Sequence, residues 1–347
     1  MHPDKKRYGL TAKDIDDMRN ARWIGLSSVQ HFLVDGLCIC CMYLLIGVCD
    51  DYDAGAYDYQ EWMDAVLTYN VLAFMSQPLT GLLADRLPAR HWLLILSSLL
   101  LTLAVAAVSL VPSLMAVAVL AGLGNSLFHV WGGKQTVVKA GNDLRALGVF
   151  VSTGALGLAV GLVYCSWGLL YVLLLSFIVL SILNVRTDRG HESRTCDAGL
   201  LPDNGTPPLI PRHWLTPVNV CVVVVLLMLF VGYRSFTGEV FAKGIHKSLT
   251  LILTIGAVSM LGKIAGGWIA QRLGILRSMA AVLAGVALCI LFRGDSVAVL
   301  LVGIFLMNTT MPVTLFLAND VLPGREGLAF GLLAAALIPG YLIAVYW

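Results

Sequence analysis

One ionisable pair lies deep inside an apolar stretch of the chain. Asp35 falls roughly halfway along the apolar run 23–48, and His31 precedes it by one helical turn, so both side chains lie on the same helix face. An ionised carboxylate inside a bilayer is costly unless it is paired or in contact with water. Burial favours the protonated acid, whereas a protonated His31 favours the carboxylate. The pair could therefore exchange a proton; a permanent structural hydrogen bond is the alternative.

Other polar residues that interrupt apolar runs are candidate substrate contacts. His129 follows Asn125 by one helical turn, and it could contact a ligand or donate to a backbone carbonyl. Arg234 lies near the end of its run, where it could reach the membrane interface or attract an anion. Lys263 lies between two glycines that suggest close helix packing, and it needs a partner or water. The predicted substrate-binding residues are Gln30, Asn125, His129, Lys134, Arg234, Lys263, Asn308 and Thr309.

Three of these predictions have an equally simple structural alternative. Lys134 lies near the end of its run and could serve only to set the orientation of the chain in the membrane. Asn308 and Thr309 precede Pro312, and their side chains could satisfy the backbone groups that a proline leaves without a partner.

The composition predicts that lipid surrounds the elements that carry these residues. Of the 347 residues 58% are hydrophobic and 13% are charged, and the mean hydropathy is +0.83. Soluble domains carry about 25% charged residues. A helix needs about 20 apolar residues to cross the hydrocarbon core. We therefore expect an all-α polytopic membrane bundle with spans near 23–48, 62–83, 92–111, 113–133, 146–165, 167–185, 216–236, 248–270, 277–293, 297–318 and 327–347.

The placement of basic residues predicts the orientation. With the N-terminus in the cytoplasm, most of the 23 Lys and Arg fall in cytoplasmic segments, and the first outer loop has several acids and no base. We expect a multi-pass protein of the cytoplasmic (inner) membrane. No cleavable targeting segment is visible. The net charge of +2 gives no reason to expect a nucleic-acid partner.

The polar stretch 186–215 divides the chain into two unequal halves. We expect a cytoplasmic segment 1–22, a six-helix bundle 23–185, a cytoplasmic linker 186–215 and a five-helix bundle 216–347. An internal repeat supports the division, because the sequence GLLADRLP that starts at Gly81 recurs as GWIAQRLG from Gly267, with Gln271 in place of Asp85. Both copies follow the second span of their half. Duplicated halves of this kind are typical of secondary transporters.

The first copy resembles the loop motif between spans two and three of the major facilitator superfamily. The matching residues are Gly81, Asp85, Arg86 and Arg90, with Pro88 where that family usually has Gly. The resemblance implies a gate in which Gly allows close helix approach and Asp and Arg form a charge lock at the membrane face. The predicted gating residues are Gly81, Asp85, Arg86, Arg90, Gly267, Gln271 and Arg272. A helix-ending loop with orienting charges is the alternative.

A narrower resemblance links the chain to the fosmidomycin resistance proteins within that superfamily. The segments 30–35 (QHFLVD) and 122–129 (GLGNSLFH) resemble their first-span and fourth-span elements. Those proteins export drugs by proton exchange, so the resemblance favours proton-coupled efflux. The superfamily plan has twelve spans, and this sequence has eleven. We expect the twelfth helix to be missing, truncated or replaced by a partner.

The sequence thus predicts a secondary active transporter, a monomer, that moves a small molecule with protons. The alternatives are a non-transporting, degenerate, receptor-like homologue and a proton-coupled importer of an organic anion. No protease, nucleotide-binding or metal-ligand spacing occurs, so we expect no enzymatic activity, cofactor or metal. The eight cysteines are interpreted as small apolar residues. The sequence leaves the substrate, the direction of transport and the coupling ion open.

Overall fold

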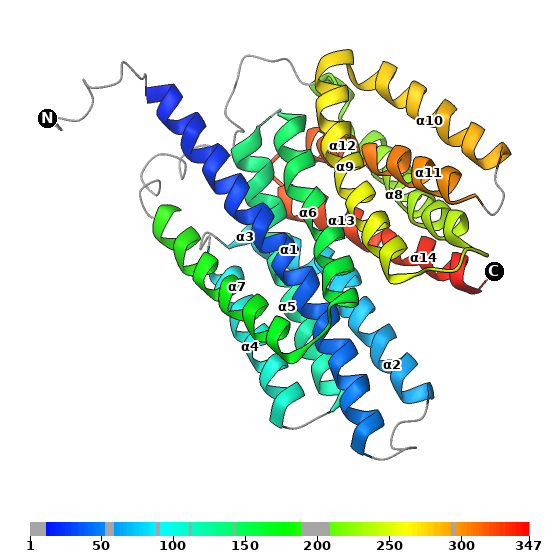
Figure 1. Cartoon of the computed structure of the whole chain (residues 1–347). Coiled ribbons are helices and arrows are strands. Elements are labelled where there is room, and N and C mark those ends of the chain that lie inside the picture. Colours follow the sequence, from blue (N-terminus) through cyan, green and yellow to red (C-terminus); the bar gives the residue numbers. More distant parts are fainter. Residues whose placement is uncertain are drawn as a thin grey trace, which may run out of the picture.

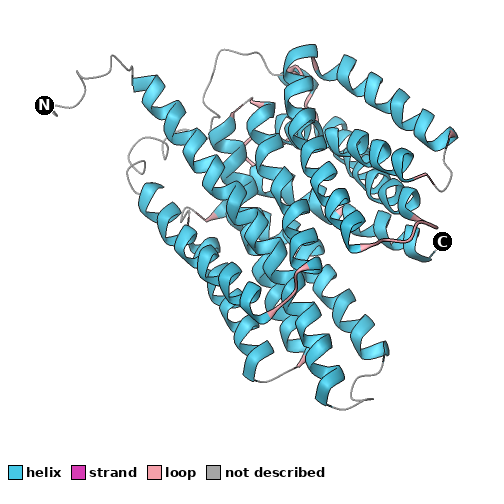
Figure 2. Cartoon of the chain, in the orientation of Figure 1, coloured by secondary structure: helices cyan, strands magenta, loops and turns pink. Residues whose placement is uncertain are grey.

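The computed structural model describes residues 12–52, 59–87, 91–110, 113–141, 143–188, 209–292 and 296–346. In these ranges all regular secondary structure is helical. The helices form two neighbouring groups, one coloured blue to green in Figure 1 and the other yellow to red, and helix α13 of the second group lies against the first (Figures 1 and 2). The all-α prediction is confirmed.

The first group contains seven α-helices and one π-helical segment. They are α1 (Ala12–Tyr52), α2 (Tyr59–Asn70), the π-helical segment η2 (Val71–Met75), α3 (Gln77–Arg86), α4 (Trp92–Leu110), α5 (Leu114–Ala140), α6 (Leu144–Val163) and α7 (Trp167–Asp188).

The second group contains a short 3-10 turn and seven α-helices. They are η3 (Arg212–Trp214), α8 (Pro217–Ala242), α9 (Leu249–Leu273), α10 (Ile275–Leu291), α11 (Val297–Thr309), α12 (Met311–Val321), α13 (Glu326–Ala335) and α14 (Leu337–Tyr346). We call residues 12–188 the N-half and residues 209–346 the C-half.

Nine helical stretches in the described residues are long and apolar enough to cross a membrane, and Ile275–Leu291 is a shorter apolar helix. The predicted span 62–83 is helical but is not among the nine, because it is divided into α2, η2 and α3. The π-helical segment packs against α5 at Gly122, where a Cβ atom would come within 2.9 Å of the Leu72 Cβ. The predicted second span therefore contains a π-helical turn, which residue periodicity does not reveal.

Large apolar side chains cover much of the outer surface, as a bilayer requires. Leu79, Leu110 and Leu276 are 72%, 79% and 83% exposed. Such broad apolar exposure is not tolerated in water, and it agrees with a lipid-facing surface. The polar candidates Asn125, His129 and others lie instead inside the bundle.

Glycines allow the two halves to approach closely at two helix pairs. In the α3–α13 pair, a Cβ atom on Gly81 would overlap the Gly327 carbonyl. In the α6–α9 pair, a Cβ atom on Gly148 would lie 2.7 Å from the Lys263 carbonyl oxygen. Backbone-to-backbone contacts of this kind are typical of membrane helix interfaces, where small residues replace hydrophobic driving force.

Within the N-half, Gly157 allows α6 to contact α1 at Phe32. A Cβ atom on Gly157 would overlap the Phe32 carbonyl oxygen, whereas Gly238 on α8 has no atom within 4 Å of its ideal Cβ position. We expect Gly157→Ala to lower the free energy of unfolding by about 1–3 kcal/mol through overpacking. Gly238→Ala should leave it unchanged or raise it by up to about 1 kcal/mol, since Ala favours helix. Denaturation of the purified protein in mixed micelles measures both; equal effects would contradict the packing described.

Candidate functional site

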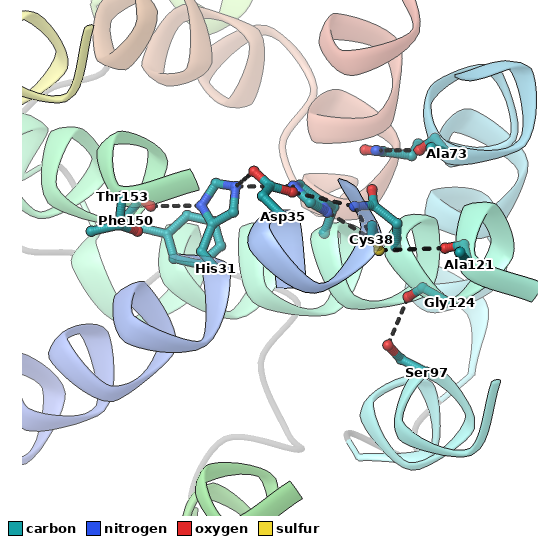
Figure 3. A network of polar contacts seen from close by, with 12 residues as sticks. His31, Asp35, Cys38, Ala73, Ser97, Ala121, Gly124, Phe150 and Thr153 are labelled. Atoms are coloured by element: carbon teal, nitrogen blue, oxygen red, sulfur yellow. Dashed lines mark hydrogen bonds and ion pairs between the residues drawn. The ribbon is translucent and has the colours of Figure 1, made fainter. Parts of the chain in front are cut away.

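Three ionisable side chains from two helices converge inside the N-half. His31 and Asp35 lie one turn apart on α1, and His129 reaches them from α5. The α6 helix closes the third side at Gly154, whose missing side chain leaves room for both groups: a Cβ atom there would overlap Asp35 and lie 2.5 Å from the His31 Nε2 atom. Figure 3 shows His31 and Asp35 directed toward one another. We call His31, Asp35 and His129 the central cluster.

The carboxylate of Asp35 has a partner on each side. Its Oδ2 atom lies 3.4 Å from the His31 Nε2 atom, and its Oδ1 atom lies 3.4 Å from the His129 Nε2 atom. The Asn125 side-chain amide donates to the same Oδ1 atom at 3.2 Å. The Asp35 side chain remains 18% exposed. It is therefore paired, and it is neither turned toward lipid without a partner nor completely enclosed.

The outer hydrogen bonds fix the tautomers of both imidazole rings. The His31 Nδ1 atom lies 2.8 Å from the Phe150 carbonyl oxygen, and the His129 Nδ1 atom lies 2.9 Å from the Asn125 carbonyl oxygen. Because a carbonyl oxygen only accepts, each Nδ1 must donate. A neutral ring with its proton on Nδ1 has a lone pair on Nε2, so both Nε2 lone pairs are directed at the centre of the cluster.

This arrangement can hold one additional proton. The two Nε2 atoms lie 2.9 Å apart. Two lone pairs at that separation repel, whereas one shared proton turns the contact into an N–H···N hydrogen bond of ordinary length. The resulting single positive charge lies beside the Asp35 carboxylate. The pair of imidazoles is thus a chemically suitable proton site, and Asp35 is its counter-ion.

The ligand-type atoms of the central cluster lie within 4.8 Å of one another, so a metal ion must also be considered. Two imidazole nitrogens bound to one tetrahedral metal ion are separated by about 3.3 Å, given bonds of about 2.0–2.1 Å. The observed Nε2–Nε2 separation is 2.9 Å. The cluster therefore fits a proton better than a metal ion.

The C-half contributes two basic side chains close to the halves' interface. Arg234 on α8 is 8% exposed, and its Nη1 atom lies 3.5 Å from the Thr314 hydroxyl oxygen of α12. Lys263 on α9 is partly buried and lies within electrostatic range of Arg234, Asp35 and His129. Cys38 and Tyr69 are the other titratable groups near Asp35.

Three other predicted substrate-binding residues form hydrogen bonds away from the central cluster. Gln30 is fully buried and exchanges hydrogen bonds with Ser181 and Asn184 of α7. Asn308 and Thr309 donate to backbone carbonyls one turn before them, at 2.8 and 2.6 Å. Both acceptors belong to the preceding turn of α11, and neither is the Asn308 carbonyl, which is the group that Pro312 leaves without its usual amide donor.

Lys134 and Asp85 of the N-half and the first amides of α13 in the C-half form a set of polar contacts that we call the Asp85 lock. The Lys134 Nζ atom lies 3.1 Å from the Asp85 carboxylate and donates to the Ala84 carbonyl at 2.8 Å. The same carboxylate accepts from the backbone amides of Gly327 at 3.0 Å and Leu328 at 2.9 Å. These amides begin α13, so Asp85 of the N-half caps a helix of the C-half. Negative charge at a helix N-terminus is stabilising.

The repeat copy makes the reciprocal contact. The Gln271 Oε1 atom on α9 accepts from the Leu144 backbone amide at 3.1 Å, at the start of α6. Beside it, the guanidinium groups of Arg145 and Arg272 lie 5.3 and 5.5 Å from the ring centre of Trp268. Each half therefore caps a helix of the other, and a neutral amide replaces the acid in the second lock.

The predicted Asp–Arg lock can be compared with the structure only at its described residues. Asp85 pairs with Lys134 and with helix amides, while Arg86 is exposed. Arg90 and Pro88 lie outside the described residues. Sequence reasoning missed the role of α13, because the acceptor is a pair of backbone amides and no side-chain pattern marks it.

Comparison with known proteins agrees with this architecture. Residues 51–344 match the family model of the Major Facilitator Superfamily. The chain belongs to this superfamily. No curated protein matches it.

Two solved superfamily structures share the fold at 15% sequence identity. One is the transporter FucP in the outward conformation, with a TM-score of 0.62, covering 94% of this chain and 90% of that chain. The other is the human organic anion transporter MFSD10 (TETRAN), with a TM-score of 0.63, covering 95% of this chain and 94% of that chain.

The Asp85 lock makes a measurable prediction. Asp85→Ala removes the cap of α13, and losing such a cap costs about 0.5–2 kcal/mol. We expect the Gly327 and Leu328 amides to exchange with deuterium about 2- to 30-fold faster, measured by mass spectrometry on the protein in lipid nanodiscs. Asp64→Ala is the matched control, because Asp64 is exposed and is hydrogen-bonded by Gln60 of its own helix. Unchanged exchange in Asp85→Ala would contradict the lock.

Proposed function

We propose that this superfamily member is a proton-coupled secondary active transporter that moves a small molecule by alternating access. The observation that carries the proposal is the central cluster, in which two Nε2 lone pairs and one carboxylate meet between membrane helices. Such a site is costly without a cation and stable with one. The partial exposure of Asp35 supports exchange with water.

In this mechanism His31 and His129 share the transported proton, and Asp35 balances its charge. Loss of the proton leaves two lone pairs 2.9 Å apart beside a carboxylate, and their repulsion favours a different arrangement of α1 and α5. This gives His129 a role that differs from substrate contact. Alternating access then needs the two halves to separate where they are now locked.

The two reciprocal locks close the end of the bundle that carries Asp85 and Gln271. The predicted orientation assigns this end to the cytoplasm, with the N-terminus on the same side. On that assignment we propose that the two halves are closed toward the cytoplasm. We propose a monomer in the cytoplasmic membrane, since each half caps the other without a second copy.

The direction of transport has two candidates. The resemblance to fosmidomycin resistance proteins favours efflux by proton exchange. The second candidate is proton-coupled uptake of an organic anion. The buried Arg234 and the partly buried Lys263 favour its substrate class, because buried positive charge attracts anions. A receptor-like homologue would show no flux in sealed vesicles under either gradient.

Asp35→Asn tests the counter-ion. A pH jump applied to proteoliposomes on a solid-supported membrane should give a transient charge displacement for the wild type, without any added substrate. We expect Asp35→Asn to lose most of it, because the shared proton loses its balancing charge. Asp64 is an exposed carboxylate on α2, and the control variant Asp64→Asn should behave as the wild type. A full-size signal in Asp35→Asn would refute the assignment.

His129→Gln separates proton binding from substrate contact. The glutamine amide can donate to the His31 Nε2 atom, so no extra proton is needed to hold the contact. We expect the same pH-jump signal to disappear while the protein still elutes as a single species. If His129 only contacts substrate, the signal in the absence of substrate will be intact, and the shared-proton mechanism fails.

A further inference from the structure

Two cations of the C-half, the buried Arg234 and the partly buried Lys263, lack an acidic partner among the described residues. Arg234 has one recorded polar contact, to the Thr314 hydroxyl oxygen at 3.5 Å. Within the described ranges Lys263 has no hydrogen bond or ion pair, and Arg234 and Asp35 are charged groups in its surroundings. Both side chains belong to spans that are long and apolar enough to cross a membrane.

The hydrogen-bonding capacity of these groups is almost unused. A guanidinium has five N–H donors and an ammonium has three, and neither can accept. The Thr314 hydroxyl donates its proton to the Met311 carbonyl at 2.9 Å and accepts from Arg234 with a lone pair. Cations in a membrane interior need acceptors as well as opposite charge. The described protein residues supply one weak acceptor for two cations.

Asp35 cannot balance the two cations as well as its own cluster. It is already placed between the two imidazoles, each at 3.4 Å. When His31 and His129 share a proton, Asp35 faces the positive charges of the histidine pair, Arg234 and Lys263. The buried Asp85 carboxylate is already paired with Lys134. Arg234 does not place its charge in the membrane interface by extending its side chain outward, since the residue is only 8% exposed. The excess of positive charge therefore requires an anion from outside the chain.

We propose that Arg234 and Lys263 form an anion-binding site, and that the transported substrate is a small organic anion with a carboxylate group. The planar guanidinium donates two parallel hydrogen bonds to a carboxylate, and the lysine supplies a second point of positive charge. The two residues belong to α8 and α9 of the C-half, and the Lys263 backbone lies against Gly148 of α6 in the N-half. This inference rests on the proposed transport function, because it names the class of substrate that the protein would transport.

Ligand-induced thermal stabilisation of the purified protein tests the site. The probes are benzoate, succinate and inorganic phosphate, with tetraethylammonium as a cationic comparison, all at constant ionic strength. We expect a carboxylate to raise the Tm in a concentration-dependent way, since ligands that bind only the folded state stabilise it. Arg234→Gln and Lys263→Gln should each weaken the apparent affinity about 10-fold or more, the effect of losing a charge-assisted hydrogen bond.

Control variants keep the test decisive. Lys247→Gln removes an exposed charge that pairs with Glu239 at 3.7 Å, and it should respond as the wild type. Arg234→Lys and Lys263→Arg keep the positive charge and should retain part of the affinity. They therefore distinguish loss of the anion site from poor folding of the glutamine variants. No response to any of the three anions overturns the proposal. An equal loss in Lys247→Gln overturns it as well.

The outcome is independent of proton coupling. Failure of anion binding with an intact pH-jump signal would remove the substrate class and leave the proton site in place. Carboxylate binding that depends on Arg234 and Lys263, together with an absent pH-jump signal, would support the anion site and reject the proton-coupled mechanism.

Discussion

An ion in hydrocarbon needs a counter-charge, and this constraint organises the interior of the molecule. The N-half satisfies it internally, because Asp35 lies between His31 and His129. The C-half does not, since Arg234 and Lys263 have no acidic partner in the described residues. This difference underlies the proposal that one half holds a proton and the other attracts an anion. In that proposal charge bound at one site changes the free energy of binding at the other, which would couple the two.

The same constraint explains how the halves are held together. Backbone amides at a helix N-terminus carry partial positive charge and have no partner within their own helix. Asp85 supplies that partner to α13, and Gln271 supplies it to α6. These contacts are reciprocal because the sequence repeat places equivalent side chains at equivalent helix ends. The acid in one lock and the amide in the other differ in charge, so the two locks differ in strength and in their response to a nearby cation.

Close approach of the helices makes these contacts possible. Gly81 faces Gly327 across the α3–α13 pair, and Gly154 leaves room beside the central cluster. In a bilayer, where apolar side chains gain little by leaving lipid, packing of this kind carries much of the association energy. Locks made of a few hydrogen bonds over glycine contacts can open without exposing a large apolar core, which suits the proposed alternating-access mechanism.

The sequence alone determined the class of the protein. Its apolar runs predicted the membrane helices, and its repeat with the Gly81 motif pointed to the superfamily, because hydropathy and recurring segments are properties of the chain itself. His31 and Asp35 could be paired from sequence, being one turn apart. Only the tertiary structure brought His129 to them, directed Gln30 toward α7, and joined Lys134 to Asp85. Those contacts depend on how helices rotate and cross, which side-chain packing decides and local residue spacing does not encode.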